Sequence, residues 1–204
     1  MVVIGLTGGI ASGKSTATDY LEDAGVPVVR ADTLARAVVA PGAPALREVA
    51  VAFPGVVDPA GVLDRRALGR LVFSDPAARH RLEAITHPRI HRYMLDWLNE
   101  RRRDGAPGAV CDIPLLYEVG YDREAGFLNT VWVVAVDPDT QLRRLMARDH
   151  LTAAAAAQRV QAQWPLERKA ALADVVLDNR GTPEALREAV LAAWRAAVPR
   201  AGGA

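Results

Sequence analysis

Apolar and polar positions along the chain follow two patterns, which together predict strands alternating with helices. Short, nearly continuous apolar runs of the kind that form buried parallel strands lie at residues 2–7, 26–30, 109–113, 130–136 and 175–178. Stretches with apolar residues three and four positions apart, which indicate amphipathic helices, occupy most of the chain between these runs. We therefore expect an α/β fold in which helices cover a parallel sheet.

The stretch between the second and third expected strands is unusually long and helical in pattern. It covers residues 33–108, about 75 residues, whereas an ordinary crossover has one helix and a few loop residues. Asp64 and Asp75 have the sequence of helix starts, and His87-Pro88 is expected between two helices. A helical stripe predicted to be core consists of Ile90, Met94, Trp97 and Leu98. The pattern predicts a helical insertion within a single unit, residues 1–204.

Basic side chains gather in the helices expected after the fourth strand. Asp137-Pro138 begins the first of these helices, which carries Arg143, Arg144 and Arg148. Each arginine taken alone is also compatible with a solvated helix face. As a group beyond a strand end they suit a lid, residues 138–173, because a planar guanidinium can bind two phosphate oxygens at once.

Composition limits the classes of protein to which the chain can belong. Half of the 204 residues are apolar, and 25 basic residues nearly balance 24 acidic ones, giving a net charge of +1. No basic stripe interleaved with aromatic residues predicts nucleic-acid binding, and residues 101–103 are interpreted as a basic helix end before Gly105. No run of about 18 apolar residues occurs, so we predict neither a membrane span nor secretion.

The cysteine and histidine residues carry little sign of chemistry. Cys111, the only cysteine, lies in an apolar run and is expected to be a buried thiol, which suits a reducing cytoplasm. The four histidines have no paired spacing, so no zinc site is predicted. His87 is a candidate for a polar contact with a substrate or for a structural contact.

The strongest chemical signal follows the first expected strand. Residues 8–15 match the phosphate-loop pattern G-x-x-x-x-G-K-[ST]. Glycines let backbone N–H groups converge on an anion, and a helix that starts at Lys14 points its positive end at the same place. Lys14 is expected to hold the β- and γ-phosphates of a nucleotide, and Ser15 a magnesium ion. The other expected nucleotide-binding residues of the loop are Gly8, Gly9, Ala11, Ser12, Gly13 and Thr16.

Two aspartates follow apolar strands and are candidates for the chemistry. Asp32 comes after the second strand and is expected to face the same crevice as the phosphate loop, although it could instead be only the N-cap of a helix over 33–39. Asp112 occupies the place of a carboxylate that contacts magnesium, directly or through water, although it could be a plain turn residue. A carboxylate that takes or orients a proton favours a hydroxyl acceptor, so Asp32 favours a hydroxyl over a phosphate.

Longer motifs of the chain resemble those of the dephospho-coenzyme A kinase family in order and spacing. They are residues 5–16, Ala31-Asp32 with Ala35-Arg36, Thr86-His87-Pro88, residues 112–118, residues 141–145, residues 159–163, and Ala173-Asp174 leading to Asn179. The likeness covers nearly the whole chain. Family members usually carry glycine where Ala11 stands.

The resemblance implies a reaction: ATP-dependent phosphorylation of the ribose 3′-hydroxyl of dephospho-coenzyme A, the last step of coenzyme A synthesis. It implies a three-layer P-loop NTPase fold similar to that of nucleoside-monophosphate kinases, with an acceptor-binding insertion and a lid. Catalytic roles fall to Lys14, Asp32 and Arg144, and ATP binding extends to Arg144 and Asn179. Acceptor binding is expected from Asp32, His87, Asp112 and Leu115. ATP, dephospho-coenzyme A and Mg²⁺ are the expected ligands, with no nucleic acid, membrane or obligate protein partner.

Two other functions compete with this interpretation. Another small hydroxyl kinase, acting on a nucleoside or on shikimate, would be separated by an acceptor assay. A GTP-dependent switch would normally carry N-K-x-D after a late strand, where this chain has Asp178-Asn179-Arg180-Gly181. Residues 58–61 match D-x-x-G by letters only, with no strand before them. The sequence therefore favours a kinase.

Overall fold

The structure, a computed structural model, describes residues 1–121 and 126–198. The chain divides into two compact units, of which the first joins residues 1–29 to 100–204 and the second comprises residues 30–99. Each unit has its own cluster of buried apolar side chains. We describe the two units separately.

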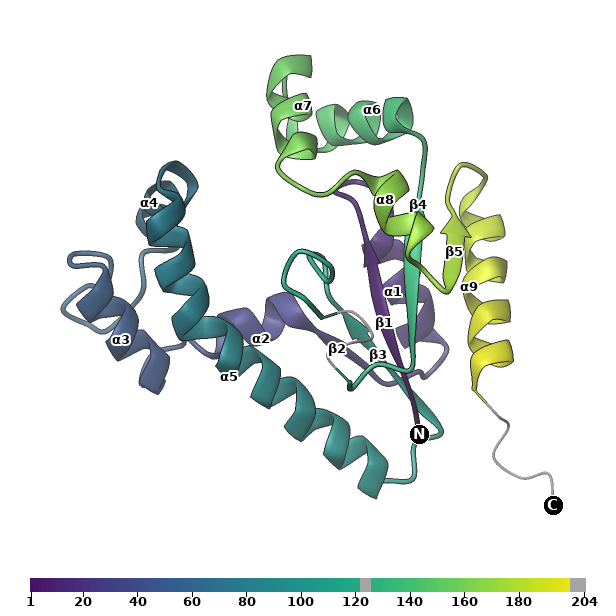
Figure 1. Ribbon diagram of the computed structural model, residues 1–204, viewed down its shortest axis with the longest axis horizontal. Helices are drawn as coiled ribbons and strands as arrows, with labels where there is room; N and C mark the ends of the chain where they lie inside the picture. The colour runs from purple at the N-terminus through teal and green to yellow at the C-terminus, as the bar shows by residue number, and fades with distance from the viewer. Residues whose placement is uncertain (122–125, 199–204) are drawn as a thin grey trace. The chain divides into compact units, whose positions relative to one another are not determined.

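A five-stranded sheet carries the fold (Figure 1). Its strands are β1 (Val2–Gly8), β2 (Val28–Arg30), β3 (Gly108–Asp112), β4 (Thr130–Ala135) and β5 (Val175–Asp178). They lie in the order β2-β3-β1-β4-β5, and β1 pairs in parallel with both β3 and β4. Because β1 is central, the loop that follows it lies between the carboxyl ends of its neighbours, where parallel sheets bind ligands. All five strands predicted from the apolar runs are confirmed, and with them the α/β class.

Helices of the first unit pack on the sheet and beyond its carboxyl edge. They are α1 (Lys14–Asp23), α6 (Pro138–Asp149), α7 (Ala153–Gln161), α8 (Leu166–Ala171) and α9 (Pro183–Ala197). Alternate residues of β1, Ile4 and Leu6, share one apolar cluster with Leu21 of α1 and with Leu186 of α9. On the opposite face of β1, a Cβ added to Gly5 would meet side chains of the segment after β3. The sheet is thus covered on both faces, as the predicted three layers require.

The second unit is helical and contains α2 (Ala31–Ala37), α3 (Pro44–Ala52), α4 (Arg65–Ser74) and most of α5 (Pro76–Arg103). Its buried cluster includes Leu46, Val49, Phe53 and Leu68. Asp64 caps α4 as predicted, because its carboxylate accepts hydrogen bonds from two first-turn N–H groups.

The prediction of a break at His87-Pro88 is wrong, since α5 runs through both residues. Pro88 removes one N–H group from the helix interior and crowds the carbonyl of the preceding turn. The guanidinium of Arg89 donates a hydrogen bond of 2.6 Å to the Ile85 carbonyl, and Thr86 Oγ1 donates one of 2.8 Å to the Leu82 carbonyl. Neither bond replaces the one lost at the carbonyl of Ala84, four residues before Pro88, so the helix continues through the proline at the cost of that hydrogen bond.

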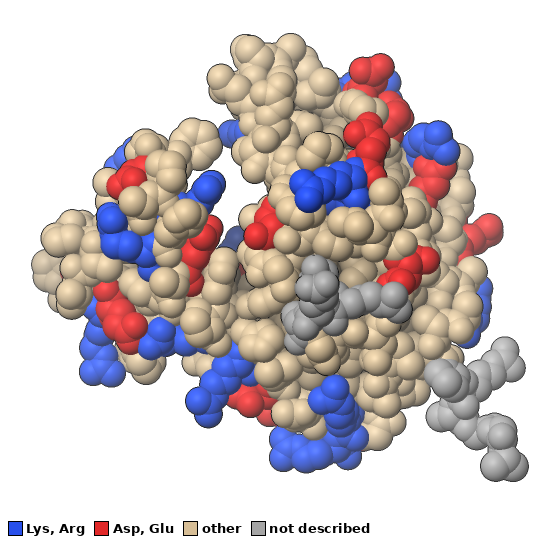
Figure 2. Space-filling view, viewed as in Figure 1, with Lys and Arg blue, Asp and Glu red and all other residues tan. Residues whose placement is uncertain are grey.

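Charged side chains of both signs are interspersed on the face shown in Figure 2, and no large field of one sign occurs there. The basic stretch 101–103 ends α5 as predicted, and Gly105 follows with a φ of 76°. In the part of the chain that the structure describes, no helix combines the length and the apolar character needed to cross a membrane.

Gly108→Val is expected to destabilise the first unit. A Cβ at Gly108 would lie 2.7 Å from Trp194 Cη2 and 2.7 Å from Val198 Cγ2, so a branched side chain would separate α9 from the start of β3. Overpacking of this kind costs about 1–3 kcal/mol in free energy of unfolding. Urea unfolding followed by circular dichroism measures it.

Gly69→Ala is the matched control. Gly69 lies in α4, and nothing stands within 4 Å of an added Cβ. Alanine is the better helix former by about 1 kcal/mol, so this variant should be as stable as the parent or more so. Equal stability of Gly108→Val and the parent protein would contradict the packing described for α9.

Candidate active site

The phosphate loop runs from the end of β1 to the start of α1, as predicted. Gly13 immediately precedes the helix with a φ of 95°, a left-handed conformation that favours glycine. A Cβ at Gly13 would also overlap the amide of Asn179. No side chain caps the first turn of α1, so its N–H groups stay available to an anion.

Lys14 and Asp112 form an ion pair at the carboxyl end of the sheet. Asp112 is the last residue of β3, is only 3% exposed and accepts from the Lys14 ammonium with Oδ1. Its other oxygen accepts a hydrogen bond of 3.0 Å from Thr18 Oγ1. The alternative of a plain turn residue is therefore wrong, because Asp112 ends a buried strand and faces the phosphate-loop lysine.

Arg144 reaches the phosphate loop, whereas its neighbouring arginines bind elsewhere. Its guanidinium donates a hydrogen bond of 3.1 Å to the Asn179 carbonyl and lies 4.0 Å from a Cβ built on Gly13. The Asn179 amide donates in turn to the Ser12 carbonyl at 2.8 Å. By contrast, Arg143 donates to Thr140 and Arg148 donates to Asp149. Of the three arginines of α6, Arg144 is thus the one placed beside the loop.

Two glutamines hold Ile10, in the middle of the loop, and their role was not predicted. Gln141 Nε2 donates to the Ile10 carbonyl at 2.8 Å, and Gln163 Oε1 accepts from the Ile10 N–H at 2.9 Å. Both residues lie in stretches that carry the family resemblance, but glutamine is most often a solvated residue. Only the contacts with Ile10 in the structure distinguish Gln141 and Gln163 from solvated glutamines.

A buried lysine beneath the loop was also missed. The Lys169 side chain has no exposed surface and pairs with Glu118, whose Oε1 lies 2.7 Å from Nζ. The same ammonium donates to the Gly8 carbonyl at 3.3 Å. Glu118 additionally accepts from the Trp164 N–H at 3.0 Å. Nothing local in the sequence signals this pair, because its members lie far apart in the chain.

The backbone of Ala11 and the hydroxyl of Ser12 are two further features of the loop that bear on anion binding. Ala11 has a φ of 58°, a conformation that costs a non-glycine residue about 1–2 kcal/mol. The Ser12 hydroxyl is buried and has no hydrogen-bond partner among the described residues. Ser15 and Thr16, in the first turn of α1, are exposed. A buried hydroxyl without a partner fits a site that an anion completes.

Three further predicted acceptor-binding residues are Asp32 and His87, of the second unit, and Leu115, of the first. Asp32 is exposed in the first turn of α2, in the second unit, and the N-cap of that helix is Arg30 without a side-chain cap bond. The alternative that Asp32 serves only as an N-cap is therefore wrong, because the helix starts at Ala31, two residues earlier than a cap at Asp32 would require. His87 is half-buried on α5, and Leu115 is 40% exposed after β3. The acceptor-binding roles of these residues stay predictions.

Cys111 is a core thiol, as predicted. It has no exposed surface, and burial together with the adjacent Asp112 charge raises the pKa of its thiol to about 12. Only the thiolate is a good nucleophile, so Cys111 is inert near neutral pH.

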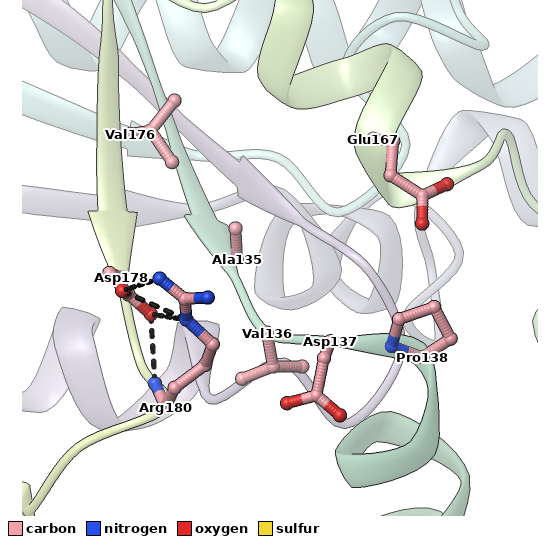
Figure 3. Close-up of a pocket in the computed structure, with 8 residues that line it drawn as sticks. All are labelled: Ala135, Val136, Asp137, Pro138, Glu167, Val176, Asp178 and Arg180. Carbon is pink, nitrogen blue, oxygen red and sulfur yellow. Dashed lines mark hydrogen bonds and ion pairs between the residues drawn. The ribbon is translucent and has the colours of Figure 1, made fainter.

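A pocket of about 360 Å³ opens where β4 and β5 end (Figure 3). Asp137, Glu167 and Asp178 line it, and one cation, Arg180, points toward Asp178 and bonds to it at 2.6 Å. The bonds from Arg180 hold the pKa of Asp178 below its usual value, and the Thr140 N–H does the same for Asp137. The carboxylates outnumber the cation, so this pocket disfavours phosphate, which is better held by the loop at Lys14.

Comparison with known proteins identifies the family. A family profile described as dephospho-CoA kinase matches residues 2–184. The chain is 47% identical to a dephospho-CoA kinase of Symbiobacterium thermophilum, over 100% of this chain and 84% of the relative.

Solved structures agree with this assignment. A protein from Thermus thermophilus is similar with a TM-score of 0.82 at 38% identity, covering 97% of this chain and 98% of that one. The dephospho-CoA kinase of Campylobacter jejuni is similar with a TM-score of 0.71 at 27% identity, covering 95% of both chains. A family profile matches residues 2–184, the identity to a relative is high over the full length of this chain, and the P-loop kinase fold is shared. The chain therefore belongs to the dephospho-CoA kinase family.

Proposed function

We propose that the protein transfers the γ-phosphoryl group of ATP to the ribose 3′-hydroxyl of dephospho-CoA, giving CoA and ADP. The observation that carries the proposal is the convergence of Lys14, Asp112 and Arg144 at the phosphate loop, in a chain of this family. The reaction would be the final step of CoA biosynthesis.

The donor site supports ATP binding. The uncapped start of α1 and the unpartnered Ser12 hydroxyl provide donors for phosphate oxygens. Lys14 supplies a positive charge on a flexible four-carbon side chain, which would exchange its bond to Asp112 for one to a phosphate oxygen. Arg144 adds a second cation beside Gly13, suited to charge that develops on the transferred group. The lid role of residues 138–173 is part of this proposal.

Mg²⁺ fits the residues at the same place. Among residues 1–121 and 126–198, no group of three or more acidic, cysteine or histidine side chains is arranged as a metal cage. Mg²⁺ commonly binds through one or two protein oxygens, substrate phosphates and water, and needs no such cage. The exposed Ser15 hydroxyl and the Asp112 carboxylate would hold it. When bound, the ion would neutralise charge on the donor phosphates.

For the acceptor, we propose that Asp32 orients the 3′-hydroxyl and accepts its proton. A hydroxyl is a poor nucleophile until its proton leaves, so a carboxylate in this role lowers the barrier. His87, Leu115 and Asp112 would complete the acceptor site, and the helical segment 33–108 would accommodate a bulky acceptor. The cytoplasmic location and the absence of protein, nucleic-acid or membrane partners stay predictions from the sequence.

Release of ADP tests the choice of acceptor. With ATP and Mg²⁺, the purified protein is expected to release ADP rapidly with dephospho-CoA and at background rates with adenosine or shikimate. A coupled assay with the three acceptors in parallel measures this. Rapid release with another acceptor and none with dephospho-CoA would refute the proposal.

Arg144→Ala should lower turnover at least tenfold, the loss that corresponds to about 1.4 kcal/mol of transition-state stabilisation. The Michaelis constant for dephospho-CoA should change less. Arg148→Ala is the matched control, because Arg148 lies on the same helix and bonds to Asp149 instead of the loop. Normal turnover in Arg144→Ala together with a loss in Arg148→Ala would place the lid arginine one helical turn further along.

Asp32→Asn should reduce the rate of a single turnover about 10²- to 10⁴-fold, because asparagine cannot accept the hydroxyl proton. The melting temperature and ATP affinity should barely change, since Asp32 is exposed and caps no helix. Asp139→Asn is the control, because Asp139 is also an exposed first-turn acid, on α6. If both variants phosphorylate dephospho-CoA at the parent rate, Asp32 is not the base.

A further inference from the structure

Three alternate carbonyl groups of the phosphate loop are held from outside by side-chain N–H donors. Lys169 donates to the Gly8 carbonyl, Gln141 to the Ile10 carbonyl and Asn179 to the Ser12 carbonyl, at 3.3, 2.8 and 2.8 Å. The donors come from α8, from α6 and from the residue after β5, all within the first unit. None belongs to the loop itself.

The planarity of the peptide bond gives these contacts a consequence. In a trans peptide, the C=O of one residue and the N–H of the next point in opposite directions. A carbonyl turned outward at positions 8, 10 and 12 therefore turns the N–H groups of Gly9, Ala11 and Gly13 inward. Converging N–H groups of this kind are what binds a phosphate.

Ile10 is held on both sides, which fixes the peptide groups before and after it. Its N–H is bound by Gln163 and does not face the anion, while the Gly9 carbonyl on the same peptide accepts from the Ser12 N–H at 3.1 Å. The next residue, Ala11, has a positive φ that alanine disfavours. The loop form with inward N–H groups thus needs support from outside.

We propose that Gln141 and Gln163 are positioning residues that hold the phosphate loop in its anion-binding form. Each glutamine is hydrogen-bonded to one of the two peptide groups of Ile10. Binding of the nucleotide phosphates therefore depends on the segment that contains α6 and α7. Two features fit the proposal. A Cβ at Gly9 would lie 2.5 Å from Gln141 Nε2, so glycine leaves room for this close approach. A cavity of about 290 Å³ borders both glutamines, so hydrogen bonds hold them more than tight packing.

Substitution by glutamate, which has nearly the same shape, distinguishes the roles of Gln141 and Gln163. The Ile10 carbonyl needs a donor from Gln141, whereas the Ile10 N–H needs an acceptor from Gln163. Gln163→Glu keeps an acceptor for the Ile10 N–H, whereas Gln141→Glu removes the donor and places a carboxylate against the Ile10 carbonyl. Both variants add the same charge, and the exposed Gln161→Glu adds it nearby as a control. We expect ADP affinity to fall about tenfold more in Gln141→Glu than in Gln163→Glu, as for an unpaired buried carbonyl.

The pH dependence of ADP binding provides a second readout. Gln141→Glu should regain affinity relative to Gln163→Glu as the pH falls, because a protonated carboxyl can donate to the Ile10 carbonyl. Calorimetric titration with ADP, without acceptor, measures both effects. If Gln141→Glu does not fold by circular dichroism, Gln141→Met removes the donor without adding charge and should show the same loss relative to Gln163→Glu.

Equal ADP affinity in the Gln141, Gln163 and Gln161 variants at every pH would overturn the proposal. The proposal rests on the proposed function only in taking the anion to be a nucleotide phosphate. Because the titration contains no acceptor, a wrong assignment of dephospho-CoA would leave its result unchanged. If Gln141 and Gln163 do not hold the loop, the choice of acceptor in the ADP-release assay is unchanged.

Discussion

A peptide group cannot offer its N–H to an anion without turning the adjacent carbonyl away from it, and the donor site depends on this constraint. Every carbonyl turned away must find a donor elsewhere, because an unpaired buried carbonyl is costly. In this protein the donors are charged or amide side chains from α6, α8 and the end of β5. The phosphate loop is therefore completed by segments more than a hundred residues further along the chain.

The same constraint explains why a lysine is buried beneath the loop at position 169. A lysine without exposed surface is unfavourable unless it is paired, and Glu118 supplies the counter-charge. A hydrophobic residue could fill the space but could not donate to the Gly8 carbonyl. The ion pair also ties α8 to the segment after β3, and Glu118 accepts a hydrogen bond from the N–H of Trp164, just before α8, as well. One cation thus joins three parts of the first unit beneath the loop.

The sequence predicted the elements that local chemistry determines. The five apolar runs became strands, and the loop at Gly13 and Lys14 followed β1 as its pattern requires. The predicted break at His87-Pro88 was wrong, because α5 runs through Pro88 although that residue has no N–H to donate to the preceding turn. Lys169, Gln141 and Gln163 were missed as site residues because their partners are distant backbone groups, which leave no periodicity or spacing in the sequence.

Two separate cores place the groups expected to act on the donor and on the acceptor. Lys14, Asp112 and Arg144 are positioned by the sheet and by the helices packed on it, whereas Asp32 belongs to a unit with its own buried cluster. The two clusters share no buried residue, so a substitution inside one leaves the apolar contacts of the other intact. On the proposed roles, donor binding depends on the first cluster and activation of the acceptor on the second. The donor site follows from contacts between described residues, whereas the proposed role of Asp32 follows from the chemistry that a hydroxyl nucleophile requires.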